Sequence, residues 1–138
     1  MVGDNAIHKE ALVDRFQSLV SDVLIRHHSV LDVLSKLSES ESRVQRAVAK
    51  SVTGCGCIKI EASRQTFPEE ASWEGVHQQA LSHVSGDLCH RDRQTVEQEV
   101  GQLLFYLTAL ANVLDISLYD VLVRKYNEAS TLGRFYLG

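Results

Sequence analysis

Two carboxylates in this sequence, Glu41 and Glu99, lie within or beside the apolar stripes of predicted helices, where an ionised group is unusual. Glu41 falls between Leu37 and Val44 in the middle of a stripe, and an isolated charge buried there would be very costly. It is therefore paired, protonated or bound to a metal, unless the helix bends near residues 38–42 and lets it reach water. Glu99 lies at the edge of a second stripe, where a carboxylate is usually solvated.

Carboxylates contributed by facing helices suit Mg²⁺, because this hard cation takes oxygen ligands and retains several waters. Glu39, Glu41 and Glu99 would form such a site if the helices that carry them pack side by side. A Mg²⁺ ion held in this way can clamp phosphate oxygens and activate a water molecule. These three glutamates are therefore the candidate magnesium ligands.

The three cysteines indicate a separate candidate site. Cys55 and Cys57 form a C-x-C pair in a glycine-containing turn, and Cys89 is followed directly by His90, with Asp92 close by. Three thiolates with an imidazole or a carboxylate could bind Zn²⁺ in a tetrahedral site. Because the spacing is looser than that of C-x-x-C pairs, three reduced, partly buried cysteines without a metal are the competing interpretation.

Apolar periodicity predicts the elements that would position these residues. The expected helices are residues 5–26, residues 29–52, a short helix from Ser72 to about Val84, a long helix from Asp92 or Thr95 to about Asp115, and a last helix after Ser117. Gly54 and Gly56 are expected to end the second helix. Ser117 is expected to cap the last one, with Asp120 at its third position. Residues 57–61 are expected to be extended.

The segment from Leu103 to Leu114 is apolar almost all round, since only Tyr106, Thr108 and Asn112 carry polar side-chain atoms. A helix of this kind has to be buried on every side, which in a chain of 138 residues needs a second subunit or a close bundle. We therefore expect an all-α bundle of four to five helices with an irregular middle segment, in a single domain over residues 1–138. The bundle is expected to form a homodimer or a tetramer.

Composition and charge argue against several classes of protein. The formal net charge is −4 and the basic residues are scattered, so a nucleic-acid partner is not expected. No apolar run reaches the roughly 18 residues of a membrane span, and residues 1–10 lack the apolar core of a signal peptide. With an odd number of cysteines and no export signal, the sequence predicts a cytoplasmic protein with reduced thiols.

Two segments carry a resemblance to a known family. Residues 99–120, EVGQLLFYLTALANVLDISLYD, resemble the second half of the all-α nucleoside triphosphate pyrophosphohydrolases of the MazG type. That family typically has E-(L/V)-G-D-L-L-F-x-L-x-x-L-A-N-x-L-G-I-D-L at this place, and Lys125 matches a lysine usual in its last helix. Residues 36–48, KLSESESRVQRAV, are similar to its first acidic helix, K-L-x-E-E-x-x-E-L-x-x-A-I.

The resemblance implies Mg²⁺-dependent hydrolysis of a nucleoside triphosphate to a monophosphate and pyrophosphate. In the family, acidic pairs on two helices hold the ion and support attack by water. By this analogy Glu41 and Glu99 would be catalytic, and together with Glu39 they would hold Mg²⁺. Lys125 and Asn112 would contact the nucleotide. Association into dimers through apolar helices is also implied.

The chain departs from the family's acidic motif at three positions. Gln102 stands where the second helix should carry aspartate, and Ser40 and Arg43 replace two ligand glutamates of the first. Since an arginine repels a cation, we expect a nucleotide-directed protein whose hydrolysis is weakened or lost. The alternative is a non-catalytic helical binding or regulatory module that responds to thiols or zinc through its three cysteines.

Overall fold

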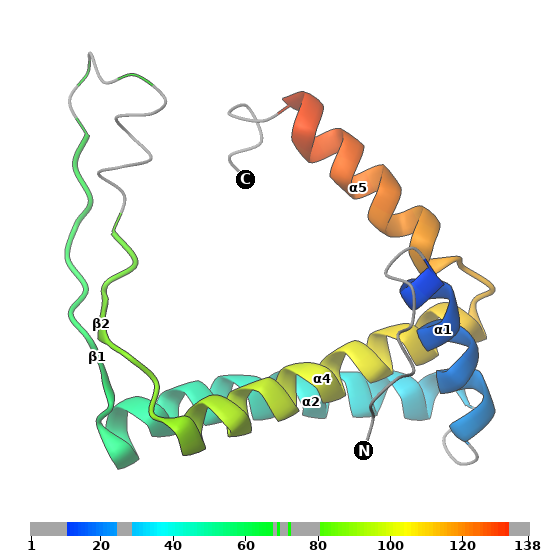
Figure 1. The fold of residues 1–138 in the computed structure, drawn as a ribbon, viewed down its shortest axis with the longest axis horizontal. Coiled ribbons are helices and arrows are strands. Elements are labelled where there is room, and N and C mark those ends of the chain that lie inside the picture. The colour runs from blue at the N-terminus through cyan, green and yellow to red at the C-terminus, as the bar shows by residue number, and fades with distance from the viewer. Residues whose placement is uncertain (1–10, 25–28, 68, 70–71, 73–80, 133–138) are drawn as a thin grey trace. The chain divides into compact units, whose positions relative to one another are not determined.

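The computed structural model describes residues 11–24, 29–67, 69, 72 and 81–132. Its elements in chain order are α1 (Leu12–Val23), α2 (Val30–Lys50), the π-helical segment η2 (Ser51–Cys55), β1 (Ile58–Ile60), β2 (Val84–Gly86), α4 (His90–Val113) and α5 (Leu118–Leu132) (Figure 1). Most of the described chain is helical, which confirms the predicted all-α class. The extended piece expected at residues 57–61 is present as β1.

Some predicted limits were wrong. The helix expected from Ser72 to Val84 does not reach its predicted end, because residues 81–83 are not helical and Val84 begins strand β2. Residues 73–80 lie outside the described residues, as does the predicted beginning of the first helix near Asn5. Helix α4 begins at His90, earlier than either start that the sequence predicts.

Contacts divide the chain into two compact units. We call residues 1–42 with 100–138 the helical unit, and residues 43–99 the hairpin unit. The long helices α2 and α4 each contribute residues to both. The core and the candidate site can therefore be assigned to one unit each.

The core of the helical unit is small. Val20 of α1, Val33 of α2 and Ala109 of α4 are fully buried and lie in one cluster. Partly buried apolar side chains surround this cluster: Phe16, Leu24, Phe105, Tyr106 and Leu110. The rings of Phe105 and Tyr106 meet edge to face with centroids 5.2 Å apart, an arrangement favoured by their quadrupoles. Three helices are thus joined by one apolar contact region.

Gln17 ties α1 to the corner between α4 and α5. Its side-chain amide donates a hydrogen bond to the Ile116 carbonyl at 2.7 Å, and its side-chain oxygen accepts one from the Leu118 amide at 2.9 Å. The Asn112 side chain donates to the Gln17 carbonyl at 3.1 Å. Since Leu118 is the first residue of α5, Gln17 satisfies an amide that has no partner within the helix.

The end of α4 is a Schellman motif. The Ile116 amide donates to the Ala111 carbonyl at 2.8 Å, and the Asp115 amide donates to the Asn112 carbonyl at 3.2 Å. Asp115 has φ of 56°, a left-handed conformation that costs a residue with a Cβ more than it costs glycine. The chain then enters α5, whose predicted cap is confirmed by the Asp120 amide donating to Ser117 Oγ at 3.2 Å.

We expect Asp115→Gly to stabilise the protein by about 1 kcal/mol, because glycine adopts this positive φ without steric cost. Urea unfolding followed by circular dichroism measures the change. Asp115→Ala is the control, since alanine retains the Cβ that causes the strain. Equal stability of the alanine and glycine variants would contradict the assignment of strain to this position.

The buried face of α2 and η2 is formed largely by small residues. Ser40, Ala47 and Ser51 are buried at helical spacing after Val33. Ser40 Oγ donates to the Lys36 carbonyl at 2.8 Å, and Ser51 Oγ donates to the Ala47 carbonyl at 3.0 Å. Each hydroxyl is thus satisfied within its own helix, and serine can occupy a buried position.

The apolar segment from Leu103 to Leu114 is not buried on every side in the single chain. Its side chains at Leu104, Leu107 and Leu114 are 51%, 42% and 52% exposed. Helix α5 has no buried residue. Within the described residues no single helix has the length and apolarity of a membrane span, although α4 and α5 meet that test as a pair bent by 109°.

Candidate metal centre

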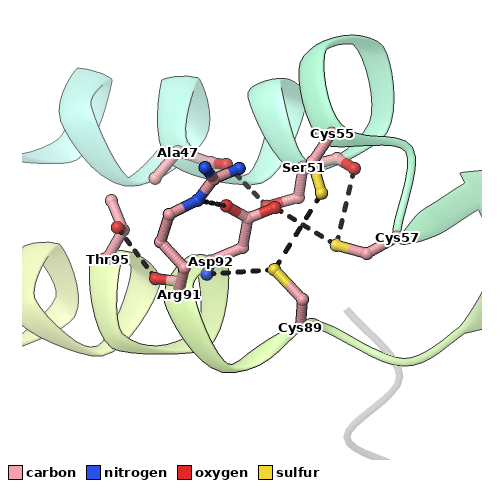
Figure 2. A network of polar contacts seen from close by, with 8 residues as sticks. All are labelled: Ala47, Ser51, Cys55, Cys57, Cys89, Arg91, Asp92 and Thr95. Atoms are coloured by element: carbon pink, nitrogen blue, oxygen red, sulfur yellow. Dashed lines mark hydrogen bonds and ion pairs between the residues drawn. The ribbon is translucent and has the colours of Figure 1, made fainter.

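Four side chains of the hairpin unit converge at one place (Figure 2). They are Cys55, Cys57, Cys89 and Asp92, and one ligand atom of each lies within 4.8 Å of the others. We call this group the thiol–carboxylate cluster. Two cysteines come from the end of η2 and the turn after it, while Cys89 lies directly before α4 and Asp92 lies in its first turn.

The antiparallel hairpin brings these distant segments together. Strands β1 and β2 pair with Ile58 opposite Gly86 and Ile60 opposite Val84, so the chain returns to its starting point before α4 begins. Cys57 lies directly before β1, and Cys89 directly before α4. The hairpin therefore places Cys57, at its beginning, beside Cys89, which follows its end.

Two glycines allow the chain to turn tightly around the cluster. Gly56 ends η2 with φ of 78°, as its position predicts, and separates Cys55 from Cys57. Gly86 has φ of 85°, and a Cβ built on it would lie 2.6 Å from the Cys57 carbonyl oxygen. A side chain at position 86 would therefore displace the backbone that carries Cys57.

The first turn of α4 orients the other two members of the cluster. The Asp92 amide donates to Cys89 Sγ at 3.4 Å, and the Arg93 amide donates to the Cys89 carbonyl at 2.8 Å. Cys89 thus occupies the N-cap position, where a side-chain acceptor satisfies an otherwise unpaired amide. Asp92 lies one helical turn later, on the same face as Cys89.

The distances within the cluster are close to those of a tetrahedral zinc site. Cys55 Sγ and Cys89 Sγ are 3.9 Å apart, and two sulfurs bound to one tetrahedral Zn²⁺ are separated by about 3.8 Å. Cys57 Sγ and Asp92 Oδ2 are 3.2 Å apart, where bound sulfur and oxygen would be separated by about 3.5 Å. Since no ligand pair exceeds 4.8 Å, movements of about 1 Å complete the site.

Hydrogen bonds within the cluster determine which of its groups are protonated in the metal-free chain. Interaction with the Asp92 side chain, with smaller contributions from Cys89 and Cys57, raises the pKa of the Cys55 thiol to about 11. The hydrogen bond from Cys57 lowers the pKa of the Asp92 carboxyl. At neutral pH Cys55 therefore keeps its proton while Asp92 is ionised. A metal that binds Cys55 has to displace that proton.

Arg91 holds the carboxylate oxygen that does not face the thiols. Its Nε lies 3.5 Å from Asp92 Oδ1, while Asp92 Oδ2 accepts the hydrogen bond from Cys57. Asp92 raises the pKa of the Arg91 guanidinium through its charge. Partners of this kind orient ligating carboxylates in known metal sites.

The structure selects between the fourth ligands that the sequence left open. The cluster contains the Asp92 carboxylate, whereas the exposed residue His90 is not among its four members. The three cysteines come together as the zinc interpretation requires. All three are free thiols, with Cys55 exposed and the other two half-buried.

The carboxylates proposed for Mg²⁺ have different surroundings. Glu41 is exposed, which is the alternative in which it reaches water, but helix α2 runs without a break through residues 38–42 and Ser40 occupies the buried position beside it. Glu39 is exposed and pairs with Lys36 at 3.2 Å. Glu99 is half-buried and belongs to the hairpin unit, whereas Glu39 and Glu41 belong to the helical unit. Among the described residues of either unit, no group of three carboxylates converges on one point.

The remaining predicted residues lie in the helical unit, apart from Arg43. Asn112 is half-buried and its amide donates to the Gln17 carbonyl, so it contributes to the corner between α4 and α5. Lys125 is exposed on α5 and pairs with Glu128 at 3.3 Å. Gln102 and Arg43, which replace acidic residues of the family's motif, are both exposed.

The residue that a cysteine count alone would miss is Asp92. Its position three residues after Cys89 is the available signal, because the N-cap and third positions of a helix face each other.

Comparison of the chain with family models, with curated proteins and with solved structures finds no match.

Proposed function

We propose that this chain is a zinc-binding helical protein in which Zn²⁺ joins the end of η2 to the first turn of α4. The observation that carries the proposal is the convergence of three sulfurs and one carboxylate oxygen within 4.8 Å. Four protein ligands leave no open coordination position, which is typical of structural rather than catalytic zinc. The proposed role of the ion is therefore to hold the base of the hairpin closed.

The chemistry of the four donors favours zinc among the common divalent metals. Ca²⁺ and Mg²⁺ take oxygen ligands and six or more coordination positions, and the cluster offers one carboxylate. Thiolates in a tetrahedral arrangement select Zn²⁺ or iron–sulfur chemistry. Arg91 beside Asp92 offsets part of the negative charge that three thiolates and a carboxylate bring to the ion.

A structural ion also fits the thin core of the hairpin unit. Among the described residues 43–67, 69, 72 and 81–99, the buried ones are Ala47, Ser51 and Ile58. Two of these have small side chains, so their burial contributes little hydrophobic free energy. Small units with little core commonly depend on a metal or a disulfide for stability.

Metal analysis of protein purified without chelator tests the proposal. We expect about one zinc per chain, and Co²⁺ substitution should give the intense charge-transfer absorption of cobalt–thiolate bonds. Asp92→Ala should weaken binding, while Asp87→Ala, at an exposed position outside the cluster, should not. Less than about a tenth of an equivalent of metal, without thiolate absorption on adding Co²⁺, would reject the proposal.

We also propose that the chain forms a homodimer through the apolar surface of α4. The exposed side chains of Leu104 and Leu107 on α4, with Leu114 directly after the helix, support this proposal, because patches of this kind mark interaction surfaces. The partner is proposed to be a second copy, as the uniformly apolar segment predicts from the sequence. This proposal is independent of the metal centre.

Leu107→Glu is expected to convert the dimer to a monomer, because it places a charge in an interface that excludes water. Sedimentation velocity at several protein concentrations measures the change. We expect the dissociation constant of the dimer to rise about a hundredfold or more. Gln102→Glu introduces the same charge at an exposed, already polar position of α4 and serves as the control. If the unchanged chain sediments as a monomer at all concentrations, the proposed homodimer is rejected.

The resemblance of residues 99–120 to MazG-type proteins supports a further proposal, a nucleotide-directed function with hydrolysis weakened or lost. The half-buried position of Glu99 on α4 is compatible with a role as a ligand. A pyrophosphate-release assay with Mg²⁺ over common and damaged nucleotides tests it, with Glu99→Gln as the inactive control. Absence of both turnover and Mg²⁺-dependent nucleotide binding would reject this function without affecting the zinc proposal.

A further inference from the structure

We propose that a hydroperoxide oxidises Cys55 and Cys89 to a disulfide, and that formation of this bond expels the metal from the thiol–carboxylate cluster. The inference rests on the proposed zinc site and adds a means of regulating it. It is carried by the contact between two sulfurs that are 34 positions apart in the sequence. The same two atoms can therefore share a metal ion or a covalent bond.

The geometry favours this pair over the other two. Cys55 Sγ and Cys89 Sγ face each other at 3.9 Å, so side-chain rotation that closes the gap by about 2 Å would reach bonding distance (Figure 2). The single hydrogen of the Cys57 thiol instead has two acceptors within reach, Asp92 Oδ2 at 3.2 Å and the Ser51 carbonyl at 3.7 Å. A bond between Cys55 and Cys57 would also close a very tight ring. Cys57 is therefore the thiol left reduced.

Exposure sets the order of the two steps. Cys55 is exposed and Cys89 is half-buried, so a peroxide reaches Cys55 first. Cys55 in the metal site is a thiolate, which attacks one peroxide oxygen, and the other oxygen leaves as an alcohol or water after taking a proton. The product is a sulfenic acid on Cys55, and the metal has lost one ligand.

Cys89 then resolves the sulfenic acid. Its thiolate attacks the Cys55 sulfur, the sulfur–oxygen bond breaks, and hydroxide leaves and is protonated to water. Overall, two thiolates, one hydroperoxide and two protons give one disulfide, one alcohol and one water. The two thiolates lose two electrons and the peroxide gains them, so no other reactant is needed.

The disulfide leaves the metal with too few ligands. Cys57 and Asp92 remain, and the Asp92 carboxylate is shared with Arg91. Two protein ligands do not hold Zn²⁺ as four do, so the ion dissociates. The covalent bond continues to join the end of η2 to the start of α4, and the contact that the ion made is replaced rather than lost.

The experiment uses the full chain, loaded with zinc and titrated with hydrogen peroxide. A chromogenic zinc indicator follows release of the ion, and peptide mass analysis without reductant identifies the linked cysteines. We expect about one zinc released for each Cys55–Cys89 disulfide, with reduction restoring zinc binding. In Cys89→Ser, dimedone should trap a sulfenic acid on Cys55.

Cys57→Ser is the matched variant, because it removes a metal ligand and leaves the oxidisable pair. Tested without metal, it should form the Cys55–Cys89 disulfide as completely as the metal-free unchanged chain. Zinc that stays bound after peroxide, or a disulfide that involves Cys57, would overturn the inference. Failure of the proposed zinc site is recognised separately, because the unchanged chain would then hold no metal before peroxide is added.

Discussion

Cys57→Ser is expected to bind zinc about a hundredfold more weakly than the unchanged chain, a loss of about 3 kcal/mol. Serine has nearly the same size and can still donate to Asp92 Oδ2, the bond that Cys57 makes at 3.2 Å. It cannot supply a thiolate, so one of the four zinc ligands is lost. Competition with a chelator of known affinity measures the difference.

The same variant separates the ion from the fold. Because the hydrogen bond at position 57 is retained, the metal-free forms of the variant and the unchanged chain should have similar stability. With zinc present, the unchanged chain should gain thermal stability and the variant should gain much less. Equal stabilisation of both proteins by zinc would show that the ion binds elsewhere.

Val33→Ala is expected to destabilise the helical unit by about 2–3 kcal/mol, because it deletes two buried carbons and leaves a cavity. Val33 is 0% exposed and lies against Val20 and Ala109 in the core cluster. Three helices meet at this cluster, so the remaining side chains cannot collapse into the space without moving a helix. Urea unfolding measures the loss as a lower midpoint at constant slope.

Leu31→Ala is the matched control for that prediction. Leu31 lies on the same helix, is 72% exposed, and loses more carbon on truncation than Val33 does. We expect its change in stability to remain within about 0.5 kcal/mol. A Leu31 variant as unstable as the Val33 variant would show that the exposed face of α2 is covered in solution.

The sequence predicted the helices well because their apolar spacing and caps are local signals. Ser117 with Asp120 and the glycine at the end of η2 have the predicted roles. The segment around Val84 was mistaken for the end of a helix because β2 is short and exposed on both faces. A short exposed strand has no alternating apolar pattern to reveal it.

The position of the apolar stripe near Glu41 was wrong for a different reason. Apolarity alone assigns a stripe through Leu37 and Val44, but the structure buries Ser40 between them. A serine that donates to the carbonyl four residues earlier is acceptable in a buried position, and hydropathy does not record that bond. Rotating the stripe by one residue moves Glu41 to the exposed face.

The cysteines of the thiol–carboxylate cluster were predictable from the sequence, but the choice between His90 and Asp92 as the fourth donor was not. With α4 expected to begin at Asp92 or Thr95, Cys89 lies outside the helix and its relation to Asp92 is undefined. The observed start at His90 makes Cys89 the N-cap and Asp92 the third helical residue. Cys89 and Asp92 therefore lie on the same face of the helix. His90, at the first helical position, is exposed.

Gly86 adds a position to the sequence pattern of the cluster beyond its four donor residues. Even a methyl group there would collide with the carbonyl of Cys57, so this position has to be glycine if the hairpin is to keep its path beside the cluster. Homologues that keep this architecture should therefore carry a C-G-C turn followed at variable distance by G-x-x-C-x-x-D. A pattern that includes both glycines will recognise distant members more selectively than the four donors alone.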